Sequence, residues 1–137
     1  MNRLRSRGFT LLELLVVMVI IGLLAAYVGP KYFSQIGKSE VKNSRVQIAG
    51  LMKALEQYRI DVGGFPSTEQ GTQALVIKPA NVTKWDGPYL DKGVPADPWG
   101  RPYLYKSPGE HAEVEITSLG RDGKPGGDGI DADITSW

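Results

Sequence analysis

The chain has 137 residues and a formal net charge of +1, so it has room for one domain and lacks the basic excess typical of nucleic-acid-binding proteins. It contains no cysteine, which excludes a fold stapled by disulfides. A domain of about 100 residues buries only a modest core. Another source of stability, such as a metal ion or assembly with neighbours, is therefore expected.

A long apolar segment follows the basic start of the chain. From Phe9 to Val28 the only charged residue is Glu13. Twenty helical residues rise about 30 Å, which matches the hydrocarbon core of a bilayer. Three arginines and no acidic residue precede the segment, which predicts a cytoplasmic N-terminus and export of the remainder. A carboxylate inside a membrane span is costly, so Glu13 is expected to have a cationic partner, such as a free α-amino group. The alternative is a carboxylate that extends to the lipid headgroups or is protonated.

Two other interpretations of this segment are weaker. An ordinary export signal has an apolar region of about 7–15 residues that ends in a small-x-small cleavage site. Residues 24–26 (Leu-Ala-Ala) are a poor version of such a site. A plain signal anchor explains length and orientation, but it leaves the order Gly-Phe-Thr-Leu-Leu-Glu at residues 8–13 unexplained.

Residues 8–13, after a short basic leader, resemble the class III signal of type IV pilins and pseudopilins. The resemblance implies that a prepilin peptidase cleaves between Gly8 and Phe9 and that Phe9 is then N-methylated. Glu13 would be the fifth residue of the mature chain, which in this family neutralises the amine of Phe9 in the next subunit. Residues 1–8 would be the cleaved leader, 9–29 the transmembrane and assembly helix, and 30–137 the periplasmic head, including the amphipathic half of the helix.

The helical pattern continues beyond Pro30, where proline predicts a kink. Apolar residues recur at helical spacings up to Val62, and two glycines then end the helix. The predicted buried stripe comprises Val41, Ile48, Leu51, Met52, Leu55, Tyr58 and Val62. The charged residues on the other faces are expected to be solvated, with Glu56 and Lys92 as secondary candidates for ion pairing between subunits.

Two local patterns are predicted in the region that follows the long helix. Ser67 and Gln70 have the spacing of a capping box, which opens a short helix through about Ile77 with Ala74 and Leu75 facing inward. Residues 97–100 (Asp-Pro-Trp-Gly) predict a turn in which the aspartate accepts backbone hydrogen bonds.

Residues 103–106 and 113–117 alternate like strands and predict an antiparallel hairpin, joined by residues 107–110 and packed on the helical stripe. The alternation places Val114 and Ile116 inside, and Glu113, Glu115 and Thr117 outside. His111 is expected to be a solvated turn residue rather than a metal ligand or a general base.

The Pro-Ser-Thr-Glu-Gln-Gly of residues 66–71 and the Asp-Pro-Trp-Gly of residues 97–100 resemble the major pseudopilins of type II secretion, the general secretion pathway G family. The resemblance implies an α+β, pilin-like fold. In that fold a long N-terminal helix, membrane-spanning in its first half, packs on a small C-terminal antiparallel sheet with a calcium-binding loop.

The C-terminal segment from residue 118 contains four aspartates among many glycines. Hard oxygen donors in a flexible loop suit calcium. Ordinary Asp-Gly turns in a solvated tail are an equally good interpretation of the composition alone. The EF-hand pattern is absent, and a calcium-binding β-helix would need several repeats where this chain has one.

The resemblance favours calcium, because G-type pseudopilins carry a Ser-Leu-Gly-x-Asp-Gly segment and a later Asp-x-Asp-Ile that together hold one calcium ion. On this chain it implies carboxylate ligands from Asp122, Asp131 and Asp133 and carbonyl ligands from Leu119 and Lys124. Asp128 lies in a variable insert and is expected outside the coordination shell.

The resemblance implies a structural subunit that polymerises into the periplasmic pseudopilus of a type II secretion system and drives export of folded proteins across the outer membrane. The implied partners are further copies in a helical fibre, minor pseudopilins, an inner-membrane assembly platform and the prepilin peptidase. The alternative is a type IV pilin of a surface or motility pilus, although many of those carry a C-terminal cysteine pair. The sequence contains no evident nucleophile–base or paired-carboxylate arrangement, so we do not expect an enzyme.

Overall fold

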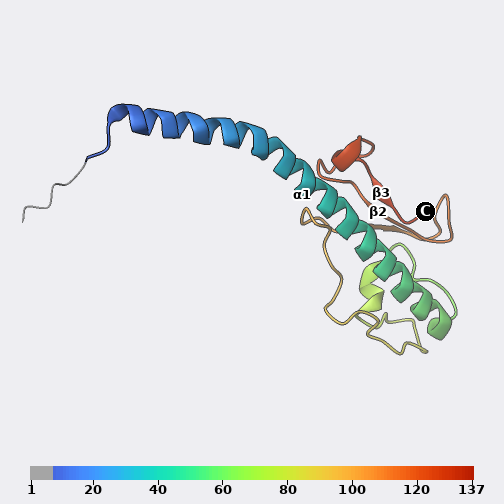
Figure 1. Cartoon of the computed structure of the whole chain (residues 1–137). Coiled ribbons are helices and arrows are strands. Elements are labelled where there is room, and N and C mark those ends of the chain that lie inside the picture. Colours follow the sequence, from blue (N-terminus) through green and yellow to red (C-terminus); the bar gives the residue numbers. More distant parts are fainter. Residues whose placement is uncertain (1–7) are drawn as a thin grey trace, which may run out of the picture. The chain divides into compact units, whose positions relative to one another are not determined.

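The computed structural model describes residues 8–137, so residues 1–7 of the predicted leader lie outside the described part of the chain. Along the chain, helix α1 (Leu11–Val62) and a 3-10 helix (Thr72–Leu75) precede strands β1 (Leu104–Lys106) and β2 (Glu115–Ser118) (Figure 1). A second 3-10 helix (Gly129–Asp131) and strand β3 (Ile134–Thr135) complete the fold. The chain divides into two compact units, one that ends at Ile36 and one that runs from Gly37 to Trp137.

The N-terminal unit contains the apolar part of α1. Every residue from Leu11 to Val28 is exposed. The helix is long and apolar enough to cross a membrane, with a mean hydropathy of 2.7 over its most apolar 18-residue window. The helix continues through Pro30, and the kink predicted there stays a prediction. Within residues 8–36, the first unit therefore presents a helical apolar surface that no other residue of this unit covers.

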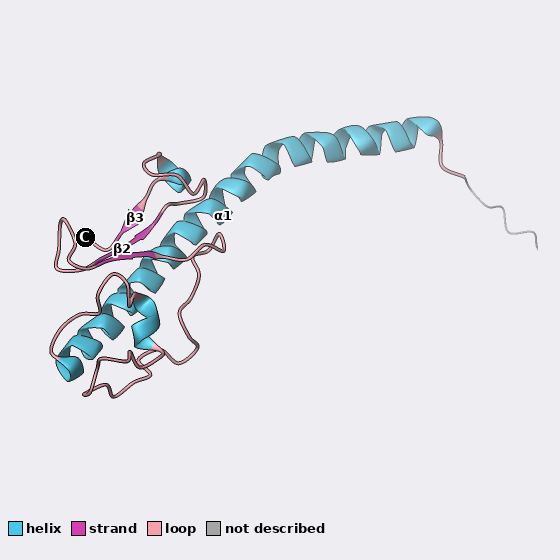
Figure 2. Cartoon of the chain, turned by 180° about the vertical axis from the view of Figure 1, so that it is seen from behind, coloured by secondary structure: helices cyan, strands magenta, loops and turns pink. Residues whose placement is uncertain are grey.

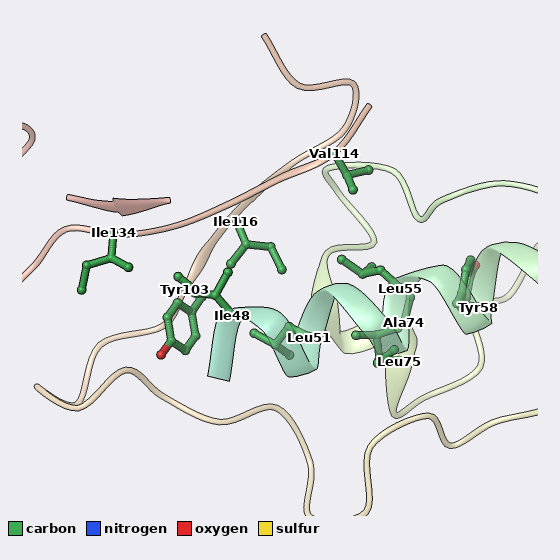
Figure 3. Packing of buried hydrophobic residues seen from close by; sticks show 11 residues of the cluster. Ile48, Leu51, Leu55, Tyr58, Ala74, Leu75, Tyr103, Val114, Ile116 and Ile134 are labelled. Carbon is green, nitrogen blue, oxygen red and sulfur yellow. The ribbon is translucent and has the colours of Figure 1, made fainter. Parts of the chain in front are cut away.

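The C-terminal unit, Gly37–Trp137, is organised around the amphipathic part of α1. Ile48, Leu51, Leu55 and Tyr58 are buried as predicted, while Val41, Met52 and Val62 are partly buried against the same core. The other buried apolar residues are Ala54, Ala74, Leu75, Tyr103, Val114, Ile116 and Ile134 (Figure 3). Burying a leucine or isoleucine contributes about 1.5–3 kcal/mol, so this stripe joins the helix to the rest of the head.

The sheet is antiparallel in the order β1-β2-β3 and lies beside the C-terminal part of α1 (Figure 2). Tyr105 pairs with Ile116, and Ser118 pairs with Ile134. The predicted hairpin is confirmed with shifted limits, because the connection runs from residue 107 to residue 114. The third strand, β3, was not predicted.

The prediction that Glu115 faces solvent is wrong. Val114 and Ile116 are buried as predicted, but Glu115 is only 6% exposed. The long connection folds back over this residue, so that the backbone N–H of His111 donates to the Glu115 carboxylate. This hydrogen bond is the main reason that the pKa of Glu115 is lowered. The His111 ring is partly exposed and stacks on Trp137, with ring centroids 4.6 Å apart.

The predicted helix from Ser67 through Ile77 is shorter in the structure. The capping-box hydrogen bonds are present: Ser67 N–H donates to Gln70 Oε1 at 2.9 Å, and Gln70 N–H donates to Ser67 Oγ at 3.2 Å. Gly71 then adopts a φ of +60°, which no helix interior allows, so only a 3-10 turn (Thr72–Leu75) follows. Ala74 and Leu75 are buried as predicted.

Candidate functional site

The first candidate site is the N-terminus of α1. Thr10 N–H donates to Glu13 Oε2 at 2.8 Å, and Glu13 N–H donates to Thr10 Oγ1 at 3.2 Å. These two bonds form a reciprocal capping box, which satisfies two backbone donors that the helix leaves free. Glu13 therefore has a polar partner within its own chain. The Thr-x-x-Glu spacing of residues 10–13 carries the signal for this cap, which was not among the expectations for Glu13.

The second candidate site is the acidic loop, residues 118–134. Each predicted carboxylate ligand has a different environment. Asp122 Oδ1 accepts a hydrogen bond from Lys124 N–H at 3.1 Å, and Asp133 Oδ2 accepts one from Gly126 N–H at 3.0 Å. Asp131 forms a two-pronged ion pair with Arg121. Within residues 8–137 no three such side chains are grouped as a metal site would require. The structure therefore does not group all three predicted carboxylates in one cluster.

One atom of the loop nevertheless fits a cation. Asp133 Oδ1 is buried and has no hydrogen-bond partner among the described residues. An unpaired carboxylate oxygen away from water is costly, and a hard cation would satisfy it. The predicted donors in the loop are all oxygens, the ligand type that calcium takes. The donor types in the loop are thus compatible with a hard cation such as calcium, and Asp131 already pairs with an arginine.

The base of the loop is tied to the turn at residues 97–100. Asp97 is 4% exposed, and its Oδ1 accepts from Trp99 N–H at 3.1 Å and from Arg101 N–H at 2.8 Å, which confirms the predicted turn. Its Oδ2 accepts from Ser118 Oγ at 2.8 Å, at the end of β2. The turn is therefore fastened to the strand from which the acidic loop departs.

Arg101 makes a second connection between the turn and the loop, which sequence reasoning missed. Its guanidinium donates to the carbonyl of Gly120 and, at 2.8 Å, to the carbonyl of Arg121. Gly123 packs on this group, because a Cβ there would lie 2.8 Å from the Arg101 Cζ. The loop is thus held at its start by hydrogen bonds that need no metal.

The opposite limb of the loop packs directly against its start. Arg121 N–H donates to the Ile130 carbonyl at 3.0 Å. Gly120 has a φ of +67°, and a Cβ there would lie 2.6 Å from the Asp131 carbonyl oxygen. Only glycine permits this backbone geometry and this close approach. The two ends of the loop are therefore joined before any ion is considered.

Comparison with known proteins identifies the family of the chain. Residues 31–137 match the family described as "Type II secretion system (T2SS), protein G", and residues 3–29 match the "Prokaryotic N-terminal methylation motif". The chain is 42% identical to the type II secretion system core protein G of Pseudomonas aeruginosa, over all of this chain and 99% of that protein. It is 41% identical to the Vibrio cholerae protein of the same name, over all of this chain and 96% of that protein.

A solved structure agrees with this assignment. The crystal structure of the major pseudopilin from the type 2 secretion system of enterohaemorrhagic Escherichia coli has a TM-score of 0.64 and 33% identity to this chain. The match covers 77% of this chain and 92% of that one. The alternative of a motility pilin is not supported, because the head itself matches protein G. The chain belongs to the type II secretion system protein G family, the major pseudopilins, which are structural subunits and not enzymes.

Proposed function

We propose that this chain polymerises into the periplasmic pseudopilus of a type II secretion system and that growth of this fibre drives folded proteins across the outer membrane. The observation that carries the proposal is the uncovered apolar surface from Leu11 to Val28, on a chain whose head matches the major pseudopilins. Such a surface is stable in lipid or against copies of itself. A head-to-tail contact that does not close generates a helical fibre.

Processing would precede assembly. Residues 1–8 would be removed by a prepilin peptidase, and Phe9 would become the methylated N-terminus. The methylation-motif match supports this division of the chain, and Phe9 is 84% exposed. We propose residues 9–29 as the membrane-spanning segment and 30–137 as the head. Mass analysis of the mature protein tests the cleavage, and a chain that still begins at Met1 would contradict it.

We infer that the chain crosses the inner membrane once, with its N-terminus in the cytoplasm and its head in the periplasm. Assembly would then involve an inner-membrane platform and minor pseudopilins as well as further copies of the chain. Because the chain has no cysteine, a single Asp91→Cys substitution provides one reactive thiol on the head. A membrane-impermeant maleimide should label it in cells with a permeable outer membrane; protection from the reagent would contradict this orientation.

Glu13 would pair with the amine of Phe9 in the neighbouring subunit, and in doing so it would exchange its bond to Thr10 N–H for a cationic partner. Glu13→Val should still insert and be processed, but it should form few fibres, measured by shearing and immunoblotting. Thr10→Ala is the matched control, because it removes the hydroxyl of the cap and keeps the carboxylate. Normal fibres from Glu13→Val would contradict the pairing.

We propose that the acidic loop binds one calcium ion through Asp122, Asp131 and Asp133, with carbonyls of Leu119 and Lys124. The unpartnered Asp133 Oδ1 and the all-oxygen donor set support this assignment. Bound calcium at a hundredfold above its dissociation constant would add about 2.7 kcal/mol to the stability of the folded chain. Chelation should therefore lower the melting temperature, and Asp122→Ala should remove this effect while the exposed Asp91→Ala keeps it. An unchanged melt in chelator would contradict the metal site.

A further inference from the structure

The ion pair between Arg121 and Asp131 occupies the carboxylate that calcium would need. Arg121 Nε lies 2.9 Å from Asp131 Oδ1, and its Nη2 lies 3.1 Å from Oδ2. Both oxygens thus accept hydrogen bonds from one guanidinium, in the fork geometry that arginine forms with carboxylates. A calcium ion coordinated by Asp131 would compete for the same oxygen lone pairs.

The backbone fixes this pair in place. Arg121 N–H donates to the Ile130 carbonyl, and Gly120 packs on the Asp131 carbonyl, so the two residues face each other across the base of the loop. The Arg121 side chain is 55% exposed and that of Asp131 is 31% exposed. An ion pair this exposed is weak, so calcium can break it.

We propose that Arg121 is an internal counter-ion for Asp131 that calcium displaces. In the absence of calcium, Arg121 neutralises this carboxylate and keeps the loop closed. In the presence of calcium, it competes for Asp131 and lowers the affinity of the loop. The inference rests on the proposed calcium site. It assigns to Arg121 a role in setting the calcium affinity of the loop.

The test is calcium titration of the full-length chain in detergent, by calorimetry, for the wild type and for Arg121→Ala. Removing the competitor should lower the dissociation constant about two- to fivefold, the range expected for an exposed ion pair. Without calcium, Arg121→Ala should melt at a lower temperature than the wild type, and calcium should raise its melting temperature by more.

Two further variants separate competition from a general charge effect. Lys84→Ala removes the same charge from an exposed position of the head outside the loop, and Lys84 is in none of the ion pairs found among residues 8–137. It should change the affinity much less than Arg121→Ala. In an Asp131→Asn background, Arg121→Ala should have no effect on affinity, because the ion pair is already absent.

The outcomes distinguish this inference from the site on which it rests. If the wild type binds calcium and Arg121→Ala binds it equally well or more weakly, Arg121 does not compete with calcium for Asp131. The proposed calcium site would then still be supported. An equal gain in affinity from Lys84→Ala would also overturn the proposed competition. If neither the wild type nor Arg121→Ala binds calcium at millimolar concentration, the calcium site and the competition are both wrong.

Discussion

Replacing Asp97 with alanine should be among the most damaging single changes in the head. The Asp97 carboxylate is buried and accepts three hydrogen bonds, from Trp99 N–H, Arg101 N–H and Ser118 Oγ. Alanine would leave two backbone donors and one hydroxyl without their acceptor. It would also release the turn that positions the Arg101 guanidinium against the start of the acidic loop.

The size of the effect follows from these three bonds. A hydrogen bond to a charged group contributes about 1.5–3 kcal/mol, and a buried donor left unpaired costs about 1–3 kcal/mol. Water entering the truncated site would recover part of this, so Asp97→Ala should lower the free energy of unfolding by about 3–4 kcal/mol. Asp97→Asn keeps the Oδ1 acceptor, and the Ser118 hydroxyl can turn to accept from the new amide. Its cost should be about 1–2 kcal/mol.

Urea unfolding of the full-length chain in detergent measures these differences. All three tryptophans of the chain lie in the Gly37–Trp137 unit, so their fluorescence reports on the head alone. Asp91→Ala is the control, since it removes an exposed carboxylate from the same region of the chain. If Asp97→Ala lies within about 1 kcal/mol of this control, the three bonds do not hold the turn as argued.

Two further substitutions test other parts of the head. The pKa of Glu115 is lowered below 4.5, chiefly by the hydrogen bond from His111 N–H. The ionised Glu115 therefore stabilises the fold above pH 4.5, and this stabilisation is lost as the pH falls through the lowered pKa of the folded state. Glu115→Gln should therefore show a smaller fall in melting temperature between pH 6 and pH 3 than the wild type, and equal falls would contradict this role. Gly120→Ala should lower the melting temperature of the head more than Gly126→Ala does. Both glycines have a positive φ, but of the two only Gly120 has backbone atoms close to the position that a Cβ would occupy. Equal losses would mean that the close approach to Asp131 is unimportant.

Sequence patterns predicted the features whose partners lie close together along the chain. The bonds between Ser67 and Gln70, and those from Trp99 and Arg101 to Asp97, join residues at most four positions apart. Residue types and spacing therefore encode them. The buried stripe of α1 was predictable for the same reason, because helical periodicity is a local property.

The features that the sequence did not predict depend on contacts between distant segments. Strand β3 has two residues, too few for an alternating pattern, and exists because β2 provides its partner. Glu115 is buried because the connection before it folds back, which alternation along one strand cannot indicate. The contacts of Arg101 with the loop join residues 19 and 20 positions apart. Nothing in the spacing of these residues distinguishes them from solvated surface charges.

These distant polar contacts explain how a head without disulfides keeps its C-terminal loop in place. The sequence predicted that a metal or assembly would supply the missing stability. The structure adds a third source of stability. Asp97 accepts from Ser118, Arg101 donates to the carbonyls of Gly120 and Arg121, and Arg121 bonds to Ile130 and Asp131 in the far limb of the loop. Each bond contributes about 1 kcal/mol, so together they hold the two ends of the loop against each other without a metal ion. Calcium would then bind to a loop whose two ends are already joined. The stability that calcium adds would depend on the strength of the ion pair between Arg121 and Asp131, which it has to break.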